Sequence, residues 1–261
     1  MLEVIHMDND DKQVGQILSR RDTLRILGIG SAALLAACTP HLSQTGHSTG
    51  GSNITGSTSN PSPASNSLPY CVVRPSMTEG PYFVDEMLNR SDIRSDPTDG
   101  SVKEGLALSL KINVSQVGNN ACVPLPGAQV DIWQCDALGV YSDAQDPSFN
   151  TKGRKFLRGY QVTDSNGLAQ FTTIYPGWYQ GRTVHIHFKI RIQRYEFTSQ
   201  LFFEDSLSDQ VFAQLPYSKK GQRTVRNAVD GIYQNGGSQL LLNVTPGKDY
   251  YSSVLDIGLQ I

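Results

Sequence analysis

Residues 183–190 of the chain read Thr-Val-His-Ile-His-Phe-Lys-Ile, a stretch in which polar and apolar side chains alternate. Successive side chains of a β-strand point to opposite faces, so the apolar set should pack against a core while His185 and His187 share the other face. Residues i and i+2 of a strand lie about 6.6 Å apart, close enough for two imidazoles to bind one metal ion. The stretch therefore predicts a strand that carries a candidate metal-binding pair.

The residues just before this strand add to the candidate site. Taken alone, a His-x-His pair is more often two polar residues on a solvated strand face. Tyr179, however, lies six residues before His185 in a Pro-Gly-Trp-Tyr loop that could fold back over the pair. Phenolate is a hard oxygen donor that suits Fe(III), whereas a zinc site more often adds Cys or carboxylate to histidine. Arg182 should point near the same centre and could hold an anion, although a loop tyrosine is more often a packing residue.

The rest of the chain shows the same period-two pattern in short segments separated by turns. Many short strands at this spacing predict an all-β, two-sheet β-sandwich with long loops and a few short helices. Helices are expected only at 208–215 and 225–233. The expected strands are 106–114, 129–136, 159–163, 169–174, 183–192, 196–203, 239–244 and 253–261.

Composition and charge are those of an ordinary globular protein. The chain has 261 residues, a formal net charge of -2, 38% hydrophobic and 18% charged residues. No basic excess points to a nucleic-acid partner, and the length suits one sizeable core.

The N-terminal segment predicts export. A twin-arginine pair, Arg20 and Arg21, precedes a short apolar run over 26–37, which ends in small residues before Cys38. The run is too short to span a bilayer and is typical of a signal peptide, and the junction resembles a bacterial lipoprotein processing site. We therefore expect lipidation of Cys38 to anchor the exported protein to a membrane of the cell envelope. The alternative is an amphipathic or buried helix with an incidental cysteine.

Composition also sets the domain boundaries. After the predicted signal peptide (1–37), residues 38–68 are mostly Ser, Thr, Gly, Asn and Pro, which predicts a flexible tether. The folded domain should therefore comprise residues 69–261. Its cysteines are Cys71, Cys122 and Cys135, and an oxidising compartment permits a disulfide. We expect a Cys71–Cys122 pair, since both lie in turn-like segments, with Cys135 buried in a strand.

Several blocks of the sequence together resemble the intradiol ring-cleavage dioxygenases, the catechol and protocatechuate 3,4-dioxygenase group. The resemblance spans about residues 71–260, and its blocks occur in the family's order. The block around the histidines, residues 178–188, resembles the family's metal-binding segment. The supporting blocks are Thr78-Glu79-Gly80-Pro81-Tyr82-Phe83, the stretch 124–134, Gly139-Val140-Tyr141-Ser142, the stretch 158–164 and Ser199-Gln200-Leu201-Phe202-Phe203.

The resemblance implies roles for particular residues. His185, His187 and Tyr179 would be iron ligands, while Arg182 and Gln200 would line the substrate and oxygen pocket. The family normally adds a second tyrosine ligand from the region before Arg158, but the loop 143–155 contains no tyrosine. Three residues could replace it. Tyr82 on the N-terminal arm is the preferred candidate, with Tyr160 and Tyr141 as rivals.

The resemblance further implies Fe(III)-dependent cleavage of a catechol-type aromatic diol by O2 to a cis,cis-muconate. The helical dimerisation region of catechol 1,2-dioxygenases has no counterpart here, so a monomer or simple homo-oligomer is expected. Two other classes stay open from the residues alone. One is a non-catalytic β-sandwich binding module, and the other is a zinc-dependent hydrolase built on the histidine pair, although no glutamate suited to general-base work lies nearby.

Overall fold

The structure is a computed structural model of the chain, and it describes residues 72–118 and 121–261. The predicted signal peptide, the tether and Cys71 lie outside the described residues. Within the two described ranges, no helix is long and apolar enough to cross a membrane.

The first sheet is built around β1 (Ala107–Val117). Along one side β1 pairs in parallel with β11 (Tyr251–Leu259), and β10 (Val244–Pro246) extends the sheet beyond β11. Along the other side β1 pairs antiparallel with β7 (Leu168–Ile174) and β2 (Cys122–Pro124).

The second sheet is antiparallel, with the strand order β6-β3-β8-β9. Its register places His187 of β8 between Trp133 of β3 and Gln200 of β9. Directly opposite residues share a face of a sheet, so these three side chains form one row. The strands are β6 (Arg158–Val162), β3 (Gln129–Trp133), β8 (His185–Ile192) and β9 (Tyr195–Phe202).

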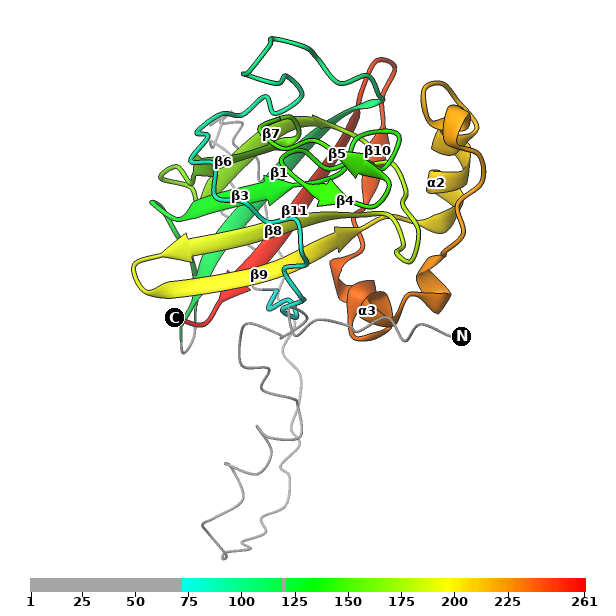
Figure 1. Cartoon of the computed structure of the whole chain (residues 1–261). Coiled ribbons are helices and arrows are strands. Elements are labelled where there is room, and N and C mark those ends of the chain that lie inside the picture. The colour runs from blue at the N-terminus through cyan, green and yellow to red at the C-terminus, as the bar shows by residue number, and fades with distance from the viewer. Residues whose placement is uncertain (1–71, 119–120) are drawn as a thin grey trace, which may run out of the picture. The chain divides into compact units, whose positions relative to one another are not determined.

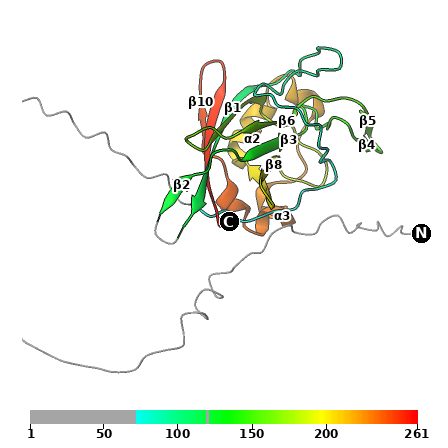
Figure 2. The same ribbon diagram turned by 90° about the vertical axis from the view of Figure 1, so that its left-hand side faces the viewer.

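The core lies between the two sheets, which are seen from the side in Figure 2. Alternate residues of β1 and β8 meet there, each with no exposed surface, and each contributes roughly 2 kcal/mol by leaving water. The all-β, two-sheet prediction is confirmed. The inward residues of these two strands are Leu108, Leu110, Ile112, Val114, Ile186, Phe188 and Ile190.

Residues 72–106 form an arm that crosses the outer face of the second sheet, shown in cyan in Figure 1. Its backbone contacts begin at β11, where Gly258 N–H donates to the Val72 carbonyl at 2.8 Å, and reach β9, where Met77 N–H donates to the Thr198 carbonyl at 3.0 Å. They continue at β6, where Tyr160 N–H donates to the Leu88 carbonyl at 2.8 Å. The arm covers the polar face of β8, so His185 and His187 are buried rather than solvated.

Short elements fill the connections between the strands, and Figure 1 labels several of them. The predicted helices are confirmed in place, although the second is broken into short turns. The predicted strand 239–244 is wrong, because Gly236 adopts a left-handed φ of 109° and starts a 3-10 turn instead. These elements are β4 (Gln145–Asp146), β5 (Phe149–Asn150), α2 (Asp205–Phe212), η2 (Tyr217–Lys220), η3 (Asn227–Val229), α3 (Gly231–Gln234) and η4 (Gly237–Leu240).

Of the two described cysteines, one forms a disulfide and the other is a free thiol. Cys122 is disulfide-bonded, and its partner lies outside the described residues, so the predicted Cys71 pairing stays a prediction. Cys135 is free and buried as expected. It lies two residues beyond the end of β3 rather than in a strand, because the chain leaves the sheet after Trp133.

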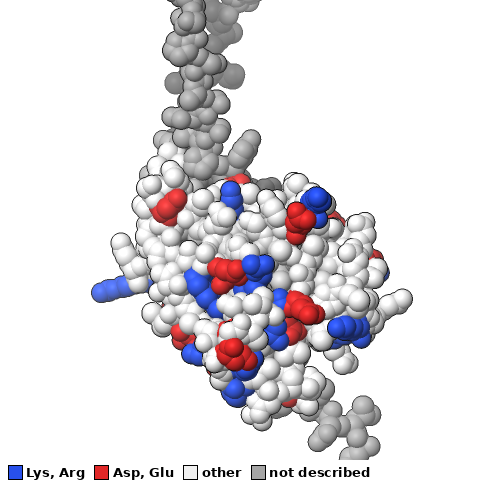
Figure 3. Space-filling model, turned by 90° about the horizontal axis from the view of Figure 1, so that it is seen from above, with Lys and Arg blue, Asp and Glu red and all other residues white. Residues whose placement is uncertain are grey.

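Several charged side chains on the described surface form ion pairs, among them Arg191 with Asp85 and Arg226 with Asp209. On the face shown in Figure 3, basic and acidic groups stand next to one another with neutral surface between them. That face therefore offers no continuous basic area for a polyanion.

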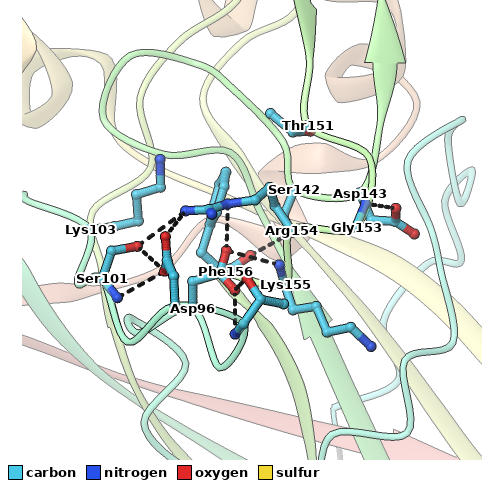
Figure 4. Close-up of polar contacts among 12 residues, drawn as sticks. Asp96, Ser101, Lys103, Ser142, Asp143, Thr151, Gly153, Arg154, Lys155 and Phe156 are labelled. Atoms are coloured by element: carbon cyan, nitrogen blue, oxygen red, sulfur yellow. Dashed lines mark hydrogen bonds and ion pairs between the residues drawn. The ribbon is translucent and has the colours of Figure 1, made fainter.

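Asp96 fixes the arm to the loop that follows β5. Its fully buried carboxylate accepts hydrogen bonds from Thr98 N and Oγ1 at 2.9 and 2.7 Å and from Lys155 N at 3.1 Å. Arg154 Nε lies 3.0 Å from the same carboxylate, and Figure 4 shows this side chain reaching across to Asp96 and Ser101. Burial acts to raise the pKa of Asp96, but these donors outweigh it and the pKa is lowered.

Asp96→Asn should lower the free energy of unfolding by roughly 2 kcal/mol at neutral pH, because hydrogen bonds to a charged group are lost. The contribution of a carboxylate with a lowered pKa is present above its unfolded value of about 4 and is lost as the pH falls toward the folded value. The difference from the wild type in urea unfolding should therefore shrink below about pH 4. Asp249→Asn, which alters an exposed carboxylate in the connection between β10 and β11, is the control and should change little. A difference that does not vary with pH would contradict this account.

Candidate functional site

His185 and His187 lie side by side on the outer face of β8, each with only 2% of its surface exposed. Their Nε2 atoms are 3.0 Å apart. His185 Nδ1 lies 2.7 Å from the Thr183 carbonyl oxygen, which can only accept a hydrogen bond. Nδ1 therefore carries the proton, and Nε2 of His185 presents a lone pair toward His187. A backbone carbonyl that fixes the tautomer in this way is typical of metal-binding histidines.

Two tyrosine hydroxyls meet the same imidazole. Tyr179 Oη is 3.1 Å from His185 Nε2, and Tyr141 Oη is 3.5 Å from it. Tyr179 comes from the loop before β8 and is partly exposed, whereas Tyr141 follows β3 and is fully buried. The predicted fold-back of the Tyr179 loop over the histidine pair is present in the structure.

The other two candidate tyrosines have different surroundings. Tyr82 stacks on the Tyr141 ring with centroids 4.5 Å apart, but its hydroxyl donates to Asp146 Oδ2 at 2.8 Å. Tyr160 lies on β6, two strands and about 10 Å from β8. The geometry therefore favours Tyr141 over Tyr82 and Tyr160 as the fourth donor.

The four donors are close enough together to serve one metal ion. His187 Nε2, Tyr179 Oη and Tyr141 Oη lie 3.0, 3.1 and 3.5 Å from His185 Nε2, which are separations expected between ligands about 2 Å from a common centre. Among the described residues, no three His, Cys, Asp or Glu side chains gather at one point. A metal at the histidine pair would therefore take its other protein ligands from phenols, and this donor set suits Fe(III) better than zinc.

Burial keeps both kinds of donor neutral when no cation is bound. Burial raises the pKa of Tyr141 and Tyr179 well above the ordinary value, and Arg182 opposes the shift at Tyr179. Burial lowers the pKa of His185 and His187 well below the ordinary value. The imidazoles are thus neutral, and the phenols would ionise only beside a strong positive charge such as a metal ion.

Arg182 and Gln200 lie together at one side of the donors, as the sequence predicted. Arg182 Nη2 donates to Gln200 Oε1 at 2.6 Å, and Gln200 Nε2 donates to the Thr78 carbonyl of the arm at 2.9 Å. Arg182 Nε donates to Asp230 Oδ2 at 2.9 Å. The pair therefore supplies a cation and an amide of fixed orientation beside the four donor residues His185, His187, Tyr141 and Tyr179, which we call the donor cluster.

The arm and β3 complete the walls. Trp133 stacks on His187 with an interplanar angle of 8° and centroids 4.9 Å apart. Gly80 of the arm, at φ 72°, passes so close that a Cβ there would lie 3.2 Å from His187 Cε1. A larger residue would push the arm away from the imidazole, so glycine is required at this crossing.

Sequence reasoning missed three supporting residues. Trp133 was recognised only as part of a core strand, although its register opposite His187 follows once β3 and β8 pair. Thr183 supports His185 only through its backbone, which carries no sequence signal. Asp230 comes from a segment 47 residues beyond Thr183, and only the fold brings it to the site.

Comparison with known proteins shows which family the chain belongs to. A family model described as "Dioxygenase" matches residues 78–227. An intradiol ring-cleavage dioxygenase from Tetranychus urticae is 33% identical, with a TM-score of 0.65, over 73% of this chain and 95% of that one. The dioxygenase domain of a carbohydrate-binding fusion protein from Streptomyces sp. SirexAA-E is 29% identical, with a TM-score of 0.53, over 73% and 99% of the two chains.

A curated relative, the catechol 1,2-dioxygenase of Candida albicans (strain SC5314 / ATCC MYA-2876), is 32% identical over an alignment of 117 positions that covers 36% of this chain. The match spans 37% of that relative's length. The fold and the site together define a β-sandwich protein with a buried donor set of two histidines and two tyrosines. The chain belongs to the intradiol ring-cleavage dioxygenase family.

Proposed function

We propose that the protein is an Fe(III)-dependent dioxygenase that cleaves a catechol-type aromatic diol with O2 to a cis,cis-muconate-type product. The observation that carries the proposal is the convergence of two imidazole nitrogens and two phenol oxygens at one buried point. The similarity to dioxygenases named for intradiol ring cleavage and for catechol supports this reaction.

His185, His187, Tyr141 and Tyr179 would hold the iron. When bound, ferric iron supplies Lewis acidity and accepts electron density from the diol, which makes the ring reactive toward O2. Tyr179 is the more exposed of the two phenols, so its Oη is the better placed to move aside and take a proton from a substrate hydroxyl.

The surrounding residues would bind the substrate and stabilise charge. Tyr82 and Tyr179 are partly exposed members of the aromatic cluster, as are Phe83 and Phe149, so an aromatic ring would reach the donors from their side. Arg182 and Gln200 would stabilise negative charge as the ring opens, because a fixed cation and amide in a dry site interact strongly with a developing anion.

Oxygen uptake by the iron-loaded protein tests this function. With catechol, protocatechuate and hydroxyquinol as substrates, we expect O2 consumption matched by ultraviolet absorption of a muconate-type product. The purified protein should also show visible absorption from tyrosinate bound to Fe(III). An iron-replete protein that turns over none of these diols would overturn the proposal, and a colourless, zinc-loaded and active hydrolase would replace it.

The cellular location is part of the proposal and is supported by sequence alone. The twin-arginine pair, the apolar run and Cys38 favour an exported protein held to a bacterial membrane by lipid. Cys38→Ala should move the protein from the membrane fraction to the soluble fraction, whereas Ser43→Ala should not. A Cys38→Ala protein that stays with membranes would contradict the lipid anchor.

A further inference from the structure

A buried carboxylate outside the donor cluster is connected to it on two sides. Asp230 precedes the short helix α3 and has 2% of its surface exposed. Its Oδ2 accepts from Arg182 Nε at 2.9 Å and from Thr183 N at 2.8 Å. Its Oδ1 accepts from Tyr233 N at 2.8 Å, which caps α3. Asp230 therefore accepts hydrogen bonds from one side chain, Arg182, and from two backbone N–H groups, those of Thr183 and Tyr233.

The first connection runs through Arg182. With Nε held by Asp230, the planar guanidinium can direct Nη2 at Gln200 Oε1 only in one orientation. Gln200 is in turn fixed by its donation to the Thr78 carbonyl. Asp230 thus begins a chain of hydrogen bonds that sets how the cation and the amide face the donor cluster.

The second connection runs through the backbone of Thr183. Asp230 accepts from the Thr183 N–H, and the Thr183 carbonyl fixes the proton on His185 Nδ1. Thr183 Oγ1 also donates to Asn227 Oδ1 at 2.6 Å. The residue that decides the His185 tautomer is therefore held by groups from the segment before α3.

We propose that Asp230 is a positioning residue for the ring-cleavage site, which orients Arg182 and fixes the His185 tautomer at the same time. This inference rests on the proposed function. Asp230 makes no hydrogen bond to the donor atoms, so it acts through Arg182 and Thr183. The competing explanation is that Asp230 is solely a cap for α3.

Asp230→Asn separates the two explanations. Both carboxylate oxygens of Asp230 accept from N–H groups, but an asparagine has only one acceptor oxygen, so its NH2 group must face at least one N–H donor. The negative charge opposite Arg182 is also lost. Loss of a residue that supports a metal ligand typically costs about 10- to 100-fold in metal affinity or activity. We expect a loss of that size in kcat/KM, a shifted visible absorption band and faster loss of iron to a chelator.

The control is Asp209→Asn, which removes a partly exposed carboxylate paired with Arg223 and Arg226, away from the site. It should leave kcat/KM, the band and iron retention unchanged. Asp230→Asn should then be repeated in an Arg182→Gln background. If Asp230 acts through Arg182, its cost in kcat/KM should fall to a few-fold there, while the effect on iron retention through His185 persists.

Wild-type kcat/KM, band and iron retention in Asp230→Asn would overturn the inference. An equal loss of kcat/KM in both backgrounds would also overturn it, because the effect would not pass through Arg182. If the Asn protein does not fold, Asp230→Glu gives the same decision, since it keeps the charge but displaces it by one methylene. If the wild type binds iron but cleaves no diol, the proposed function fails, and iron retention alone decides the role of Asp230. A wild type that binds no iron would overturn both.

Discussion

Tyr141→Phe is expected to remove much of the visible absorption of the iron-loaded protein and to reduce kcat by at least about 100-fold. That figure is the upper end of the loss caused by removing a residue that merely supports a metal ligand. Tyr141 Oη is one of the two phenol oxygens within 3.5 Å of His185 Nε2, so its loss leaves a single phenolate. The remaining band, from Tyr179, should shift because the electron donation to the metal changes.

Two other tyrosines provide matched controls for this prediction. Tyr82→Phe removes only the hydrogen bond to Asp146 and keeps the ring stacked on Tyr141, so the band should survive and kcat should change by a few-fold. Tyr160→Phe alters a residue two strands away and should have no effect on the band. A Tyr141→Phe protein with the wild-type band, together with loss of the band in Tyr82→Phe, would return Tyr82 to the position of fourth donor.

The choice between these tyrosines shows where sequence reasoning reached its limit. Tyr141 lies in the block 139–142 that resembles the family and is one of the rival candidates, but the family pattern places the second tyrosine in the region before Arg158, and the loop 143–155 there contains none. Whether a hydroxyl meets His185 depends on how the turn after β3 directs the chain, and that turn has no sequence periodicity. By contrast, Tyr179, His185 and His187 lie within nine residues of one another, and strand alternation alone placed the histidines on one face.

Some elements of the fold could likewise be predicted from the sequence, and others could not. β1 and β8 were predictable because each alternates over eight or more residues, which is long enough to distinguish a strand from other structures. The two-residue strands β4 and β5 carry too few residues for any pattern. The arm over β8 could not be foreseen in detail either, because its contacts, such as Lys189 with Glu79, join segments more than a hundred residues apart.

The two proposed phenol ligands owe their spacing to a contact between backbones. The turn 136–139 precedes Tyr141, and Gly177 precedes Tyr179 by two residues. Gly177 N–H donates to the Asp136 carbonyl at 3.1 Å. A Cβ on Gly177 would lie 2.5 Å from the carbonyl oxygens of Asp136 and Ala137. Because these are backbone atoms, no side-chain rotation can relieve the clash, and one of the two segments must move.

Gly177→Ala should therefore lower the free energy of unfolding by roughly 1–3 kcal/mol, the usual cost of overpacking a filled site, and should also disturb the metal centre. Moving the loop changes the position of Tyr179 relative to Tyr141, so iron retention and the visible band should change with the melting temperature. Gly231→Ala is the control, because a Cβ there meets nothing within 4 Å. If Gly177→Ala melted like Gly231→Ala and kept the wild-type band, this backbone contact would not set the distance between the two phenols. If Gly177→Ala lowered the melting temperature but left the visible band unchanged, the clash would be relieved by a movement that does not reach Tyr179 or Tyr141. The positions of the two phenols would then not depend on this backbone contact.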